Sequence, residues 1–146
     1  MKPFLAFVCL MFIGCAPSVV NYTTRSFNLN SFIETTPGEA LIQWESGKKI
    51  TTSGWKYDRI RKSLIYGGIV ANVIKVSYRE DYIDGGTGGE TRQPVYQELQ
   101  YNLNQSPMMI FQDIKIRVES ASLEKLRFKV LQPPAGFRWA EKDTIQ

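Results

Sequence analysis

The sequence contains no histidine, and its two cysteines, Cys9 and Cys15, lie within the first fifteen of its 146 residues. These absences exclude a Ser-His-Asp or Cys-His catalytic arrangement and a zinc site built from histidine and cysteine. No disulfide can connect parts of the chain beyond Cys15, so packing must stabilise the fold. An enzyme would have to rely on carboxylates, lysine or tyrosine, and no motif for such chemistry is present. We therefore expect no catalytic residue, no metal and no cofactor.

The overall composition is that of a folded, mildly basic protein. Hydrophobic residues make up 43% of the chain and aromatic residues 12%, which is enough for a packed core. The formal net charge is +4. Proteins that bind nucleic acid usually concentrate positive charge more strongly, so we expect no nucleic-acid partner. The charge is compatible with an anionic surface nearby.

The N-terminal segment has the layout of a secretory signal. Lys2 precedes an apolar stretch from Phe4 to Ile13, and the small residue Gly14 follows. A membrane-spanning helix needs about 20 apolar residues, and this run is shorter and is interrupted at Pro17. The segment is therefore interpreted as an export signal and not as a membrane span.

The stretch FIGC, residues Phe12 to Cys15, resembles the lipobox of bacterial lipoprotein precursors. The resemblance implies that residues 1–14 are removed as a signal peptide and that Cys15 becomes the acylated first residue. Cys9 cannot play the same part, because the bulky Val8 precedes it. The alternative is an ordinary N-terminal helix in which the cysteine packs as a small apolar side chain.

Acylation would fix the place of the protein in the cell. Two or three long acyl chains on Cys15 make dissociation from a lipid bilayer negligible. The lipoprotein class uses an aspartate after the cysteine for retention at the inner membrane of enteric bacteria, and here Ala16 stands at that position. The resemblance therefore implies an exported, lipid-anchored protein, at the outer membrane if the host is Gram-negative.

The chain after Cys15 divides into a tether, a domain and a tail. Residues 15–37 are rich in Ser, Thr and Asn, and we expect a tether there with at most one short strand, around 19–22. Pro37-Gly38 is a turn pair at the entrance to a β-sandwich domain over residues 38–132. Residues 133–146 form the tail, in which Phe137 and Trp139 are expected to cover a core edge.

About seven short runs of β-branched and aromatic residues, separated by turn residues, predict an all-β fold. We expect an antiparallel β-sandwich (immunoglobulin-like) or a small barrel. Ser46-Gly47 and Gly67-Gly68 are interpreted as turns between strands, and 84–90 as an open loop. The patterning of residues 69–131, with SYRE, QELQYNL and the pair FQDIKIRV and KLRFKVL, resembles that of small uncharacterised bacterial lipoproteins, and the resemblance implies no activity.

The two runs near the C-terminus predict an antiparallel hairpin with one buried face. Ile114, Ile116 and Val118 alternate with polar residues, and so do Leu126, Phe128 and Val130. The outward positions carry one acid, Glu119, and a set of cations: Lys115, Arg117, Lys125, Arg127 and Lys129. This face could contact anionic lipid, lipopolysaccharide or an acidic partner, or it could be a solvated face that protects the sheet from aggregation.

Two further groups of residues are candidate binding sites. Trp55 and Tyr57 lie in a turn-rich stretch, and we expect them to be exposed, where they could stack on a sugar or a partner. The acids around the open loop, Glu80, Asp81, Asp84 and Glu90, could bind calcium, act as a glycosidase pair, or simply be solvated. None of these motifs is specific enough to name a ligand.

Together these observations predict a lipid-anchored protein of the bacterial envelope with no enzymatic activity. Its domain would act as a structural or protein-interaction module with an envelope protein partner. The alternative is a ligand-binding lipoprotein that recognises a glycan or an anionic molecule through the aromatic side chains or the cationic face.

Overall fold

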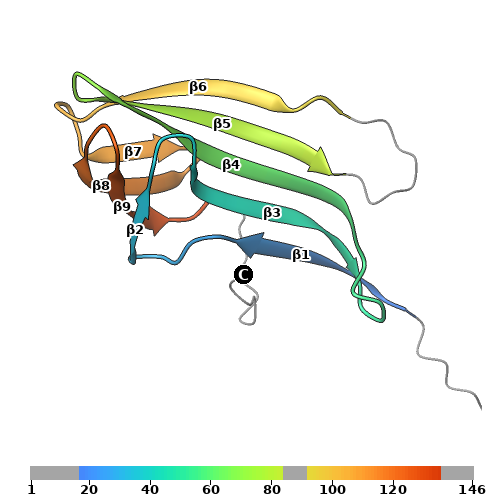
Figure 1. The fold of residues 1–146 in the computed structure, drawn as a ribbon. Coiled ribbons are helices and arrows are strands. Elements are labelled where there is room, and N and C mark those ends of the chain that lie inside the picture. Colours follow the sequence, from blue (N-terminus) through green and yellow to red (C-terminus); the bar gives the residue numbers. More distant parts are fainter. Residues whose placement is uncertain (1–16, 84–91, 136–146) are drawn as a thin grey trace, which may run out of the picture.

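The computed structural model describes residues 17–83 and 92–135, which form two antiparallel β-sheets packed as a sandwich (Figure 1). The five-stranded sheet has the order β1-β3-β4-β5-β6, with β1 at Val19–Arg25, β3 at Ala40–Ile50, β4 at Lys56–Val70, β5 at Val73–Ile83 and β6 at Val95–Asn102. The four-stranded sheet has the order β2-β9-β8-β7, with β2 at Phe32–Thr35, β7 at Met108–Phe111, β8 at Ile114–Ala121 and β9 at Leu126–Gln132. The expected all-β, antiparallel sandwich is confirmed, and the described residues form nine strands where about seven were expected.

The core lies between the two sheets. Alternate residues of the central strands point into it, and Tyr66, Ile74 and Phe128 are fully buried. The Tyr66 hydroxyl crosses the core and donates a hydrogen bond of 3.0 Å to the carbonyl of Ser122, so it also connects the sheets. The remaining members of the core are Phe27, Leu41, Ile42, Trp44, Leu64, Val76, Tyr78, Met109, Ile114, Ile116, Val118, Leu126 and Val130.

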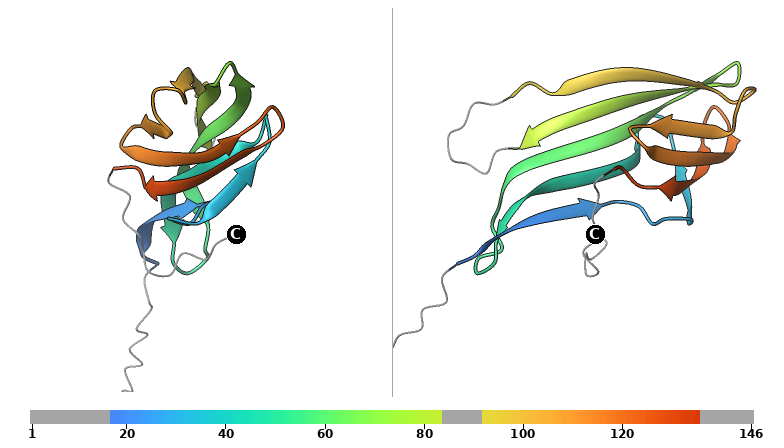
Figure 2. Two further views of the ribbon diagram at one scale, coloured as in Figure 1. Left: turned by 90° about the vertical axis from the view of Figure 1, so that its left-hand side faces the viewer. Right: turned by 180° about the vertical axis from the view of Figure 1, so that it is seen from behind.

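The two sheets differ in length, and this difference sets the shape of the molecule. β4 has 15 residues, which corresponds to about 50 Å of extended chain, whereas β8 has only eight. The four-stranded sheet therefore covers one end of the five-stranded sheet, and the other end extends beyond it as an overhang (Figures 1 and 2). The overhang contains the start of β1, the end of β3 and the start of β4.

The short strand expected around residues 19–22 is present as part of β1, but the expected tether is wrong over much of its remaining length. β1 pairs with β3 along seven residues, and β2 pairs with β9, so residues 19–25 and 32–35 are parts of the two sheets. The domain thus begins well before residue 38. The Ser- and Thr-rich composition was misleading because β1 and β2 are edge strands, which need few apolar residues.

Two glycine-containing segments that were expected to be turns lie inside strands. β3 continues through Ser46-Gly47 and β4 through Gly67-Gly68, and each pairing has a bulge at the glycine. A Cβ atom at Gly47 would lie 3.1 Å from Tyr22 Cε1 and from the Tyr57 carbonyl oxygen, so close packing requires a glycine. The turn between β4 and β5 instead uses Ala71 and Asn72, both at positive φ.

The C-terminal hairpin is confirmed. β8 and β9 pair antiparallel, and the residues predicted to face the core are buried. β9 ends at Gln132, directly before Pro133-Pro134, which lack the N–H groups that would continue the strand. The predicted positions of Phe137 and Trp139 lie outside the described residues, as does Cys15.

Candidate functional site

The outer face of the four-stranded sheet carries the predicted cations. Lys115, Arg117, Lys125 and Arg127 are exposed and Lys129 is partly exposed, all on the side away from the core. The strand register places Arg117 directly opposite Lys129 on the neighbouring strand. Like charges that face each other across an antiparallel pair are unfavourable, so this position favours an anionic neighbour. We call these five side chains the cationic face.

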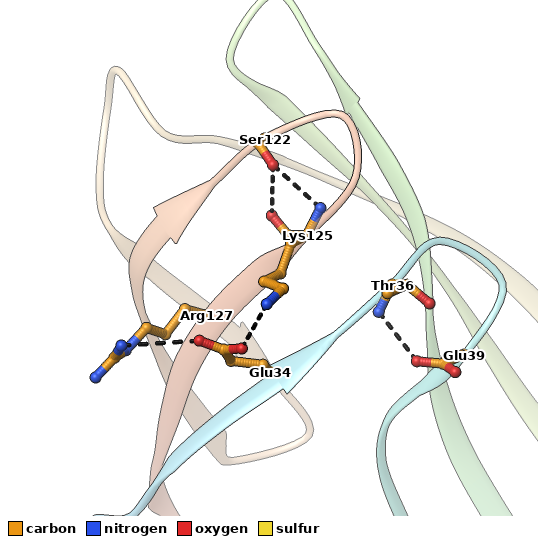
Figure 3. Close-up of polar contacts among 6 residues, drawn as sticks. All are labelled: Glu34, Thr36, Glu39, Ser122, Lys125 and Arg127. Atoms are coloured by element: carbon orange, nitrogen blue, oxygen red, sulfur yellow. Dashed lines mark hydrogen bonds and ion pairs between the residues drawn. The ribbon is translucent and has the colours of Figure 1, made fainter.

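Only part of this charge is neutralised within the described chain. Glu34 on β2 accepts a hydrogen bond of 2.7 Å from Lys125 Nζ and lies 3.7 Å from Arg127 Nη1 (Figure 3). The hydrogen bond and charge of Lys125 lower the pKa of Glu34. Glu119 lies 3.6 Å from Arg117. Two carboxylates against five cations leave the face positively charged.

Lys125 is also held in place by the turn that precedes β9. Its backbone N–H donates to Ser122 Oγ at 3.1 Å, and its carbonyl accepts from the same hydroxyl at 3.2 Å (Figure 3). The neighbouring turn between β2 and β3 is closed in a similar way, since the N–H of Thr36 donates to Glu39 Oε2 at 3.1 Å. The backbone of Lys125, at this end of the cationic face, is therefore held by the hydrogen bonds of the turn.

Exposed apolar side chains lie among the cations. The ring of Phe32 is 50% exposed, and it lies 4.2 Å from the guanidinium of Arg127 and 3.8 Å from Lys129 Nζ. Ile110 is opposite Lys115 in the register and is 56% exposed. The face therefore combines positive charge with apolar area, a combination that suits a macromolecular surface better than a small ion.

Trp55 and Tyr57 lie at the opposite end of the molecule, at the tip of the overhang. Trp55 is exposed, as expected, and Tyr57 is half-buried at the start of β4. Their rings stack with centroids 5.6 Å apart. Lys48 Nζ lies 5.8 Å from the Tyr57 ring and forms an ion pair of 2.8 Å with Asp58.

A cluster of polar side chains around one buried carboxylate, which the sequence did not reveal, lies on the outer face of the five-stranded sheet. Glu45 is only 8% exposed. One of its oxygens accepts a hydrogen bond of 2.7 Å from the Tyr22 hydroxyl, and the other accepts from Arg61 Nε at 3.2 Å and Nη2 at 3.0 Å. Desolvation opposes ionisation of Glu45, but these hydrogen bonds and the charges of Arg61 and Arg59 lower its pKa overall.

An open, polar pocket of about 230 Å³ adjoins this cluster. Its lining includes Lys56, Arg59, Arg61 and the carboxylate of Glu45. Arg59 Nη1 lies 4.0 Å from Glu45, and Arg59 Nε is buried without a hydrogen-bond partner in the described structure. The excess of cations over carboxylates makes this pocket a candidate site for a small anion. No local sequence pattern indicates this pocket, because most of its lining residues come from β1, β3 and β4.

Of the acids predicted near the open loop, the two that the structure describes, Glu80 and Asp81, do not converge. Glu80 and Asp81 are neighbours on β5, so they point to opposite faces of the sheet. Glu80 accepts hydrogen bonds of 2.6 Å from the Tyr78 and Tyr82 hydroxyls and pairs with Lys62 at 3.3 Å, while Asp81 pairs with Arg79 at 2.8 Å. Asp84 and Glu90 lie outside the described residues. Within residues 17–83 and 92–135, no group of three potential ligands that could hold a metal is found.

Comparison of the chain with protein-family models, with curated proteins and with solved structures finds no match. No helix in the described part of the chain is long and apolar enough to cross a membrane. The candidate sites are therefore inferred from the geometry of this structure alone. They are the cationic face, the anion pocket beside Glu45, and the aromatic tip of the overhang.

Proposed function

We propose that this chain is an exported bacterial lipoprotein, acylated at Cys15, whose β-sandwich is a non-enzymatic interaction module for an acidic envelope protein. The observation that carries the interaction is the cationic face, where Arg117 lies directly opposite Lys129 with exposed Phe32 beside them. An acidic partner would relieve the repulsion between these cations and would bury apolar area at the same time.

The position of this face supports the proposal. The four-stranded sheet lies at the end of the sandwich away from the start of β1 (Figure 1). An anchor at Cys15 would therefore hold the cationic face away from the attachment point, where it is accessible to another protein.

A second candidate function is the binding of a small anionic molecule, such as a phosphorylated or carboxylated sugar. The observation that favours it is the pocket of about 230 Å³ lined by Lys56, Arg59 and Arg61. Arg59 would be the main contact, because only a 4.0 Å ion pair with Glu45 engages its guanidinium and its buried Nε has no partner among the described residues. An Arg59→Gln variant should then lose the calorimetric signal on titration with a sugar phosphate, whereas Lys75→Gln, a distant exposed position, should retain it.

Two experiments test the main proposal, one for the anchor and one for the face. Mass spectrometry of the mature N-terminal peptide should show a diacylglycerol-modified Cys15, and the Cys15→Ser variant should accumulate as uncleaved precursor. A photo-crosslinking residue placed at position 117 or 129 should trap a protein in intact cells, and the same residue at position 75 should not.

Charge reversal provides the control for the crosslink. The double variant Arg117→Glu/Lys129→Glu should abolish a crosslink formed from position 115, while Lys75→Glu should leave it unchanged. A Cys15 without lipid would refute the anchor. Crosslinks of equal yield and identity from positions 75 and 117 would refute the face as a specific binding site.

A further inference from the structure

The start of the described chain is fastened to the tip of the overhang. The carbonyl of Ser18 accepts hydrogen bonds from the Thr51 N–H at 3.0 Å and from the Thr51 hydroxyl at 3.1 Å. The two hydroxyls also lie 3.0 Å apart. From Val19 onward, β1 pairs with β3 without interruption. The turn between β3 and β4 and the beginning of the domain are therefore one ordered unit.

This fastening limits how far the domain can lie from Cys15. Only Ala16 and Pro17 separate Cys15 from Ser18, and three fully extended residues span about 11 Å. The position of the domain relative to a membrane rests on the proposed acylation of Cys15. If Cys15 carries lipid, the end of the overhang must lie within about that distance of the bilayer surface.

The side chains at this end have the chemistry of a membrane interface. In the register, Val19 lies opposite Ile50, and the N–H of Ile50 donates to the carbonyl of Trp55 at 2.9 Å, so these three residues form one row. Val19 is 54% exposed and Trp55 45% exposed. Tryptophan is favoured at the headgroup level, because its ring is apolar and its N–H can still reach water.

The next row along the strands adds positive charge. Val20, Lys49 and Lys56 lie side by side across β1, β3 and β4. The two lysines face each other directly, an unfavourable arrangement that a negatively charged surface would relieve. Each lysine close to an anionic leaflet favours the docked orientation by about fivefold. The two rows point to opposite faces of the sheet, since successive residues of a strand alternate. Both rows lie at the end of the sheet, so a leaflet that meets this end can contact the apolar row and the lysines together.

We infer that the tip of the overhang, formed by Val19, Val20, Lys49, Trp55 and Lys56, docks on the headgroup region of the leaflet that holds the acylated Cys15. The end of the five-stranded sheet then contacts the membrane, and the domain keeps one orientation instead of moving on a flexible tether. The strands of the five-stranded sheet rise from the surface and carry the four-stranded sheet, with its cationic face, away from it (Figures 1 and 2). This orientation also accounts for the exposure of Trp55.

Cysteine labelling of the acylated protein tests the orientation. Removal of residues 1–14 and acylation of Cys15 would leave the mature chain without a free thiol, because no other cysteine is present. Single variants Thr52→Cys, at the tip, and Leu123→Cys, an exposed position in the β8–β9 turn, each introduce one. The purified lipoprotein is inserted from detergent into preformed vesicles of phosphatidylethanolamine and phosphatidylglycerol and treated with a membrane-impermeant maleimide.

We expect the labelling rate of Thr52→Cys to fall at least about fivefold from detergent to vesicles, and that of Leu123→Cys to stay unchanged. Brominated acyl chains should quench tryptophan fluorescence, and Trp55→Phe should remove this quenching. The variant Lys49→Glu/Lys56→Glu should restore labelling at position 52, whereas Lys115→Glu/Lys129→Glu, with the same change in charge, should not.

The outcomes separate this inference from the proposed acylation. An N-terminal peptide without lipid refutes the acylation, and the docking, which depends on the acylation, is then refuted as well. A lipid-modified Cys15 together with equal labelling of positions 52 and 123 in vesicles refutes the docking alone. Quenching that persists in Trp55→Phe also contradicts it, because the quenched tryptophan would then not be at the tip.

Discussion

The glutamate buried on the outer face of the long sheet should make the fold sensitive to acid and to a single substitution. Glu45→Gln keeps the size of the side chain but removes its charge and one of its two acceptor oxygens. In the native protein these oxygens accept three hydrogen bonds, from the Tyr22 hydroxyl and from two nitrogens of Arg61. The variant must therefore leave at least one donor without an acceptor.

The size of the effect follows from these contacts. A hydrogen bond to a charged group contributes about 1.5–3 kcal/mol, and the loss of a buried partner costs about the same. The adjoining pocket is open, so water can reach part of the cluster, and we expect Glu45→Gln to lower the free energy of unfolding by about 2 kcal/mol. Tyr22→Phe, which removes one hydrogen bond to this carboxylate, should cost about 1.5 kcal/mol, the lower end of that range.

The pH dependence has a definite sign. The pKa of Glu45 is lower in the folded protein than its ordinary value of 4.5, so the unfolded chain binds the proton more tightly. The stabilisation by Glu45 is therefore complete above about pH 5 and is lost as the pH falls through 4.5 toward the lower folded-state pKa. The Gln variant should lack this part of the acid sensitivity.

Urea unfolding at pH 7 and at pH 3.5 measures both effects. A matched control is Glu98→Gln, because Glu98 is exposed and its carboxylate accepts a single hydrogen bond of 2.7 Å from the Ser77 hydroxyl. This control should change stability by less than about 0.5 kcal/mol. If Glu45→Gln at pH 7 is no more destabilising than Glu98→Gln, the view of Glu45 as a stabilising centre is wrong.

Three further substitutions test the packing and the turns, each by urea unfolding at pH 7. Phe128→Ala removes a fully buried ring and should cost about 3–5 kcal/mol; a loss below about 1 kcal/mol would contradict its place in the core. Gly47→Ala should cost about 1–3 kcal/mol, because the new Cβ would lie 3.1 Å from Tyr22 Cε1 and the Tyr57 carbonyl; an unchanged stability would show that the bulge has room. Ala71→Gly should raise stability by about 0.5 kcal/mol, because alanine is strained at a φ of 50° and glycine is not; a clear destabilisation would contradict this interpretation of the turn.

The alternation of residues predicted the elements with one buried face. In β8 and β9 every second residue is apolar, and the structure buries Ile114, Ile116, Leu126 and Phe128 as expected. The same pattern placed the cations on the outer face, because side chains alternate between the two faces of a strand. A short-range pattern is enough to predict these two strands, since each strand has one face buried in the core and one face exposed to solvent.

The predictions failed where the partner strand decides the local structure. Gly47 and Gly68 suggested turns, yet both lie at bulges inside strands whose pairing continues beyond them. Residues 19–35 suggested a tether, yet an edge strand gains its stability from backbone hydrogen bonds to a distant segment. Composition describes the side chains of a segment, but it does not specify which backbone N–H and C=O groups will form hydrogen bonds with another strand.

The sequence by itself determined the all-β class and the C-terminal hairpin with its cations. Only the tertiary structure decided that Glu45 is buried among Tyr22, Arg59 and Arg61, and that Ser18 is fastened to Thr51 at the tip of the long sheet. These contacts join residues 14 to 33 positions apart. Their existence depends on strand order and register, which are properties of the whole sheet and not of any one segment.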